Sequence, residues 1–148
     1  MPYDWNGVIK FVRYRLPPHE ELEIPANCLP PPENVGFRPS IGMKPGSHYR
    51  LPLPDGTGIH IRFYEGRYYI HWDKCDPLTR GILCHLAKDA PYVILAGGAI
   101  LGALYELFSS NQPGLKDLIR GALKGMGVGL IIQALLELLY SNANSYEY

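Results

Sequence analysis

The sequence lacks an excess of charge of either sign, because its 148 residues include 14 Lys and Arg and 14 Asp and Glu. Proteins that hold nucleic acid through its phosphates carry a basic patch or stripe, and this balance provides no surplus for one. We therefore expect no nucleic-acid partner. The length suits one domain, or a small domain with an appendage, that buries its own hydrophobic core.

Cysteine is also scarce. Cys28, Cys75 and Cys84 are odd in number and lack C-x-x-C spacing, which argues against a disulfide framework and a structural zinc site. We expect reduced thiols, no metal and no other cofactor. The first residues lack the basic and apolar segments of a cleaved secretion signal. We expect synthesis in the cytoplasm, followed by membrane association or by export as folded cargo.

The common catalytic motifs are missing as well. The sequence contains no G-x-S-x-G elbow, no phosphate-binding loop ending in Gly-Lys-Ser/Thr, no H-E-x-x-H zinc motif and no dinucleotide fingerprint. Each of these motifs would identify a reaction class through the local structure that it builds. Their absence favours a protein that is not an enzyme.

The clearest strand pattern runs from Gly58 to Lys74, where apolar and polar residues alternate on both sides of Glu65-Gly66. This pattern predicts a β-hairpin in which Tyr64 faces Arg67 and His60 faces His71. One face of the hairpin is apolar and holds Ile59, Ile61, Phe63, Tyr68, Ile70 and Trp72. The other is polar and holds His60, Arg62, Tyr64, Arg67, Tyr69, His71 and Asp73.

The polar face contains the candidate catalytic residues His60, His71, Arg62 and Asp73. Two histidines acting as general acid and base, with an arginine on the anion, would suit a small hydrolase or a metal-independent ribonuclease. Two facing imidazoles could instead share a transition metal with Asp73 as a third ligand. They could also repel one another when both are protonated, so that mild acid loosens the hairpin. The simplest interpretation is a solvated polar face.

The sequence before the hairpin suggests extended structure. The β-branched and aromatic residues from Val8 to Leu16 predict a first strand. Ten of the 14 prolines lie between Pro17 and Pro54, which predicts a proline-rich strap rather than a helix. We assign this β-rich region to residues 1–75.

Helices are predicted for residues 76–140. A short helix starts at Asp76-Pro77 and runs to about Lys88, and Ala90-Pro91 marks a bend. Two apolar helices follow, separated by Pro113-Gly114, and a polar tail covers residues 141–148. The expected fold class is α+β: a small antiparallel β-sheet with a proline-rich strap, then a short helix and a C-terminal glycine-rich helical hairpin.

The two apolar helices carry glycines spaced four residues apart, a pattern known as a glycine zipper. When the chain folds back on itself, Gly98 faces Gly125 and Gly102 faces Gly121, so the two backbones approach closely. The candidate helix-packing residues are Gly98, Gly102, Gly121, Gly125 and Gly129.

The hairpin gives the main functional hypothesis. We expect a non-enzymatic protein, such as a small membrane-active toxin or effector, that inserts into membranes or self-associates through this hairpin. Its partners would be membrane lipid or further copies of the chain in a homo-oligomer. Two alternatives remain open: a soluble structural or assembly module whose hairpin belongs to the core, and a small hydrolase or ribonuclease that uses His60 and His71.

Overall fold

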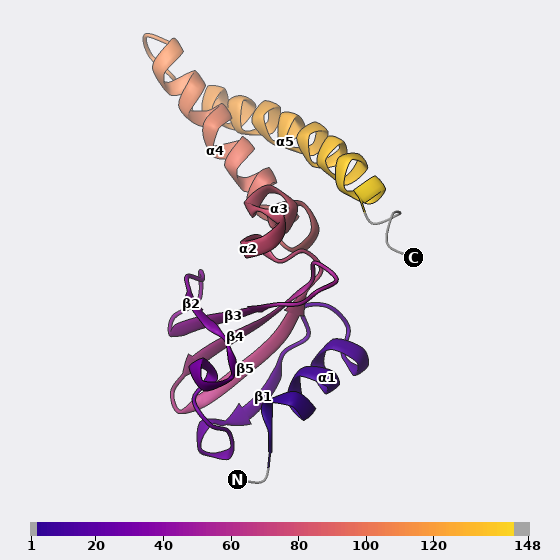
Figure 1. Cartoon of the computed structure of the whole chain (residues 1–148). Coiled ribbons are helices and arrows are strands. Elements are labelled where there is room, and N and C mark those ends of the chain that lie inside the picture. Colours follow the sequence, from indigo (N-terminus) through magenta and orange to yellow (C-terminus); the bar gives the residue numbers. More distant parts are fainter. Residues whose placement is uncertain (1–2, 144–148) are drawn as a thin grey trace. The chain divides into compact units, whose positions relative to one another are not determined.

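The computed structural model describes residues 3–143 and divides the chain into two compact units, one ending at Gly81 and the other beginning at Ile82. The first unit contains an antiparallel β-sheet with a helix, and the second consists of helices (Figure 1). The predicted α+β class is confirmed.

The sheet of the first unit has five strands in the order β1-β5-β4-β3-β2, and every neighbouring pair is antiparallel. The β4–β5 hairpin has the predicted register, with Tyr64 opposite Arg67 and His60 opposite His71. Its turn residues Glu65 and Gly66 have φ values of 48° and 75°, which suits a tight hairpin turn. The strands are β1 (Leu22–Pro25), β2 (Arg38–Ser40), β3 (Ser47–Pro52), β4 (Gly58–Tyr64) and β5 (Arg67–Asp73).

The proline-rich segment between Pro17 and Pro54 does not form a separate strap. It supplies strands β1, β2 and β3 and two short 3-10 helices, Ala26–Cys28 and Pro32–Val35. Pro25 and Pro39 lie on β1 and β2, the two edge strands, where a residue without an N–H group is tolerated. A third proline, Pro52, is the last residue of the inner strand β3.

The predicted first strand is wrong, because residues Trp5–Arg15 form helix α1. Asp4 caps the helix by accepting a 2.8 Å hydrogen bond from the backbone N–H of Gly7. Trp5, Val8 and Val12 follow a helical spacing and are all buried. This spacing outweighs the strand propensity of the β-branched residues.

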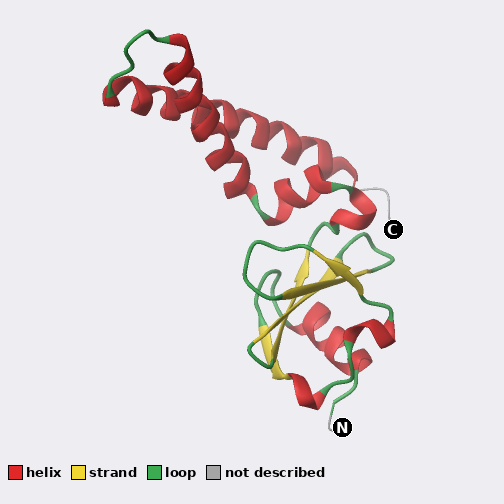
Figure 2. Ribbon diagram, turned by 90° about the vertical axis from the view of Figure 1, so that its left-hand side faces the viewer, coloured by secondary structure: helices red, strands yellow, loops and turns green. Residues whose placement is uncertain are grey.

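Helix α1 covers the apolar face of the sheet (Figure 2). Val12, Ile59, Ile61 and Ile70 are completely buried, and the Trp5 ring lies 5.5 Å from that of Tyr68. The predicted apolar face of the β4–β5 hairpin is therefore the main core surface of this unit.

The predicted helix from Asp76 to Lys88 is broken into α2 (Pro77–Arg80), which belongs to the first unit, and α3 (Ile82–Asp89), which begins the second. The break lies at Gly81, whose φ of 85° is readily adopted only by glycine. Cys75 and Cys84 are disulfide-bonded and Cys28 is free, so the expectation of three reduced thiols is wrong for two of them.

The second unit continues with α4 (Pro91–Ser109) and α5 (Leu115–Ala143), which lie side by side in an antiparallel hairpin (Figure 1). The predicted bend at Ala90-Pro91 separates α3 from α4. Residues 141–143 of the predicted tail belong to α5, and residues 144–148 lie outside the described residues.

Candidate functional site

Strand β3 extends the polar face of the β4–β5 hairpin. His48 on β3 lies opposite Arg62, and Arg50 lies opposite His60. We call His48, Arg50, His60, His71 and Asp73 the polar row. His71 is partly exposed and the other four residues are buried, so the central part of this face is not solvated as the simplest interpretation expected.

The hydrogen bonds of the polar row determine the tautomers of two histidines. His48 Nε2 lies 2.8 Å from the carbonyl oxygen of Lys44, which only accepts, so Nε2 of His48 carries the hydrogen. A neutral His48 therefore accepts at Nδ1, and His60 Nε2 donates to it over 2.9 Å. This leaves Nδ1 of His60 as an unprotonated nitrogen.

Asp73 connects the other end of the polar row. Its Oδ2 accepts a 2.6 Å hydrogen bond from Arg50 Nη1, and its Oδ1 lies 3.1 Å from His71 Nε2. In neutral His71, Nε2 then carries the hydrogen and Nδ1 is unprotonated. That Nδ1 atom is buried and has no hydrogen-bond partner among residues 3–143. An unsatisfied buried acceptor of this kind is costly in a native structure.

The electrostatics of the row work against an acid–base pair made of His60 and His71. Burial first and the Arg50 charge second lower the pKa of His60 to about 2, so this imidazole stays neutral at ordinary pH. Burial alone would raise the pKa of Asp73, but the hydrogen bond from His71 and the contact with Arg50 outweigh it and lower that pKa. An imidazole with so low a pKa is a weak general base, and it is not protonated to act as an imidazolium acid near neutral pH.

Arg62 shares the face but not the hydrogen bonds of the row. Its guanidinium carbon lies 4.2 Å from the ring centroid of Tyr69, and its Nη1 donates to the carbonyl of Pro45 over 3.3 Å. It is therefore held by stacking on an aromatic ring. The structure brings His60, His71 and Asp73 together and leaves Arg62 beside them.

Three residues near the site were missed by sequence reasoning. The period-two pattern from Ser47 to Leu51 places His48 and Arg50 on one face and could have revealed both. His19 carries no such signal, since it lies in a loop with a φ of 67°. A ring nitrogen of His19 lies within 4.8 Å of an Asp73 carboxylate oxygen.

No protein-family model matches this chain, and searches of curated proteins and of solved structures return no significant match. Function must therefore be argued from the geometry of the chain itself.

The second notable feature is the contact between α4 and α5, which is made by glycines. A Cβ atom on Gly98 would collide with the carbonyl oxygen of Gly125, and one on Gly102 with that of Gly121. A Cβ atom on Gly121 would in turn collide with the carbonyl oxygen of Gly102, and one on Gly125 with that of Gly98. Only glycine permits this close approach of the two helices.

Outside this contact, the described residues of the two helices are exposed or only partly buried. Each is long and apolar enough to cross a membrane, yet none of the apolar window in α4 and only 6% of that in α5 is buried. The core helix of a soluble protein would be mostly buried. Large apolar side chains on the exposed surface include Ile100, Leu101, Tyr105, Phe108, Ile131, Leu135 and Leu138.

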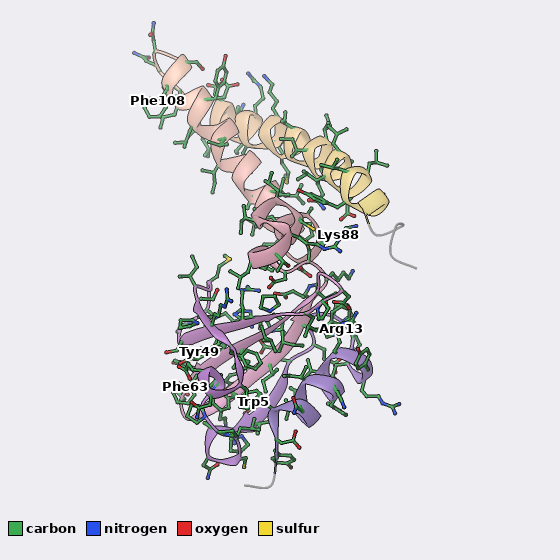
Figure 3. All side chains as sticks on the ribbon, viewed as in Figure 1. Trp5, Arg13, Tyr49, Phe63, Lys88 and Phe108 are labelled. Atoms are coloured by element: carbon green, nitrogen blue, oxygen red, sulfur yellow. The ribbon has the colours of Figure 1, made fainter. Side chains whose placement is uncertain are left out.

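The charged residues of the hairpin are paired near its two ends. Lys124 Nζ lies 3.7 Å from Glu106 Oε1 near the turn. At the other end, Lys88 on α3 pairs with Glu137 on α5 over 2.9 Å. Figure 3 labels Phe108 near the turn and Lys88 at that opposite end. Gln133 also donates to the Ala87 carbonyl over 2.8 Å.

Proposed function

We propose that this protein is membrane-associated and that the α4–α5 hairpin inserts into the bilayer. The observation that supports the proposal is that almost none of the residues in the apolar windows of α4 and α5 is buried, while many of their large apolar side chains are exposed. Monomeric soluble proteins rarely expose apolar patches larger than a few hundred Å². Lipid covers such a surface without requiring a matching partner protein.

The backbone and the polar side chains of the hairpin suit this environment. A helix satisfies its own backbone hydrogen bonds, which is the main requirement for a segment in lipid. Gln133 and Glu137 would be costly in an isolated apolar helix, but α3 provides Ala87 O and Lys88 as their partners. The hairpin thus carries partners for Gln133 Nε2 and for Glu137 with it, whereas Gln133 Oε1 is buried without a partner among residues 3–143.

The positions of the ion pairs limit the depth of insertion. Lys124 and Glu137 are 13 residues apart on α5, so the charge-free band between them is about 20 Å long. This is shorter than the hydrocarbon core of about 30 Å. Lysine side chains that extend to the headgroups and local thinning of the bilayer accommodate such a difference. We infer that the two ion pairs lie at the two membrane surfaces.

Flotation with lipid vesicles tests the proposal. Leu130 and Ile131 lie near the middle of the charge-free band and are 56% and 63% exposed. Aspartate at each position costs little in water but about 2.5 to 3.5 kcal/mol at the centre of a bilayer. We expect the wild-type protein to float with the vesicles and the Leu130→Asp, Ile131→Asp double variant to remain in the lower fractions. The matched control is Ile41→Asp, which changes a 90% exposed residue of the first unit and should float as wild type does.

Self-association is the competing explanation for the exposed surface. It predicts a wild-type protein that does not float and that elutes as a soluble oligomer in size-exclusion chromatography, with the double variant eluting as a monomer. That result would overturn the membrane proposal.

A further inference from the structure

We propose that His60 and His71, with Asp73 as the carboxylate that orients His71, form a binding site for a divalent transition-metal ion that prefers imidazole ligands, such as Zn²⁺, Ni²⁺ or Cu²⁺. One potential ligand atom from each of these residues lies within 4.8 Å of the others. His60 and His71 are cross-strand neighbours, so the sheet itself fixes their separation. This inference is independent of membrane binding.

Two unprotonated nitrogens are available to the ion. The tautomers set by the hydrogen-bond chain leave Nδ1 of His60 and Nδ1 of His71 with free electron pairs. The His71 atom is buried without a hydrogen-bond partner in the described part of the chain. A metal ion would satisfy it.

The surrounding hydrogen bonds resemble the supporting contacts of metal sites. A histidine ligand usually donates its other ring N–H to a carboxylate, a carbonyl or another acceptor, which fixes its orientation. His60 donates to His48, which is itself held by Lys44 O, and His71 donates to Asp73. Arg50 holds the second oxygen of Asp73. Each candidate ligand therefore already has the support that a metal site needs.

The charges of the site select the kind of ion. Arg50 neutralises the one carboxylate of the cluster, so the site has little attraction for Ca²⁺ or Mg²⁺, which prefer several oxygen ligands. Imidazole nitrogens are ligands that Zn²⁺, Ni²⁺ and Cu²⁺ accept readily.

The geometry requires only small movements. Ligand atoms around one tetrahedral Zn²⁺ are about 3.4 Å apart when each bond is about 2.1 Å. A ring nitrogen of His60 and one of His71 already lie within 4.8 Å of one another. Rotations about the side-chain bonds of the two residues change this separation without a change in the sheet.

Titration of the full-length, metal-free protein in detergent micelles with Co²⁺ tests the site, because imidazole-bound Co²⁺ has visible absorption bands. Zn²⁺ should displace Co²⁺ and abolish these bands. We expect saturable binding in the micromolar range by the wild type. His60→Gln and His71→Gln should each weaken it at least about tenfold. Glutamine keeps a donor for His48 or Asp73 but removes the ligand nitrogen.

Further variants separate ligands from supporting residues. Asp73→Asn should weaken binding, whereas Asp55→Asn, the same change in the exposed Arg13–Asp55 ion pair, should leave affinity unchanged within about twofold. Tryptophan fluorescence of each metal-free variant reports whether the first unit is folded. If Asp73→Asn does not fold, the two histidine variants decide the question. Absence of saturable binding by the wild type, or wild-type affinity in both histidine variants, would overturn the proposal.

Discussion

Replacement of His60 by glutamine should make the first unit less sensitive to acid. In the folded protein burial lowers the pKa of His60 to about 2, whereas an unfolded chain has a histidine pKa of about 6.5. Below pH 6.5 the unfolded state therefore binds a proton that the folded state does not. Linkage requires that stability is full above this pH and decreases as the pH falls.

The size of the effect follows from the two pKa values. Between pH 7 and pH 5, His60 alone should remove about 2 kcal/mol from the free energy of unfolding, at about 1.4 kcal/mol per pH unit once well below 6.5. Asp73 does not contribute in this interval. Its lowered pKa affects stability only as the pH falls below the ordinary aspartate value of about 3.9.

The assay is urea unfolding of the full-length protein in the presence of a metal chelator. Both tryptophans, Trp5 and Trp72, lie in the first unit and report its unfolding by fluorescence. For a typical urea dependence, 2 kcal/mol corresponds to a decrease in the midpoint of roughly 0.7 to 2 M. Glutamine keeps a donor for His48 Nδ1. Between pH 7 and pH 5, the urea midpoint of His60→Gln should therefore decrease by roughly 0.7 to 2 M less than the midpoint of the wild type. Parallel pH dependence in the two proteins would refute the reasoning.

Three further predictions concern packing and charge. Gly125→Ala should destabilise the α4–α5 hairpin, seen as weaker helical thermal stability by circular dichroism, because its Cβ collides with Gly98. Gly127→Ala on the same helix has open space and should stabilise it by up to about 1 kcal/mol. Arg50→Ala leaves Asp73 buried without its cation and should cost about 3 to 5 kcal/mol in urea unfolding, whereas loss of an exposed pair costs about 1 kcal/mol or less. Val12→Ala should cost about 1 to 3 kcal/mol in the same assay and would show, if neutral, that α1 does not pack on the sheet.

The β4–β5 hairpin could be predicted in detail because two local signals agree. Alternation assigns each residue to a face, and the two-residue turn at Glu65-Gly66 fixes the register. Helix α1 was missed because strand propensity was weighed above the helical spacing of Trp5, Val8 and Val12. The contact of these three side chains with the sheet favours the helix over the strand, and it cannot be read from local sequence.

The candidate metal site was only partly predictable. Its histidines follow from the hairpin register, but their burial depends on β3, which pairs through residues earlier in the chain. The hydrogen bond from His60 to His48 and the ion pair of Asp73 with Arg50 connect residues 12 and 23 positions apart. No local pattern specifies such partners, so the polar face was expected to be solvated.

The strand order has a consequence for how the chain folds during synthesis. Leu22 on β1 pairs with Ile70 on β5, which is 48 residues later. At about 5 to 20 residues per second, a ribosome needs roughly 2 to 10 s to make that partner after β1. Meanwhile the apolar side chains of α1 and β1 have no sheet to cover. The start of the chain would therefore depend on chaperones during this interval, before the apolar helices of the second unit have been made.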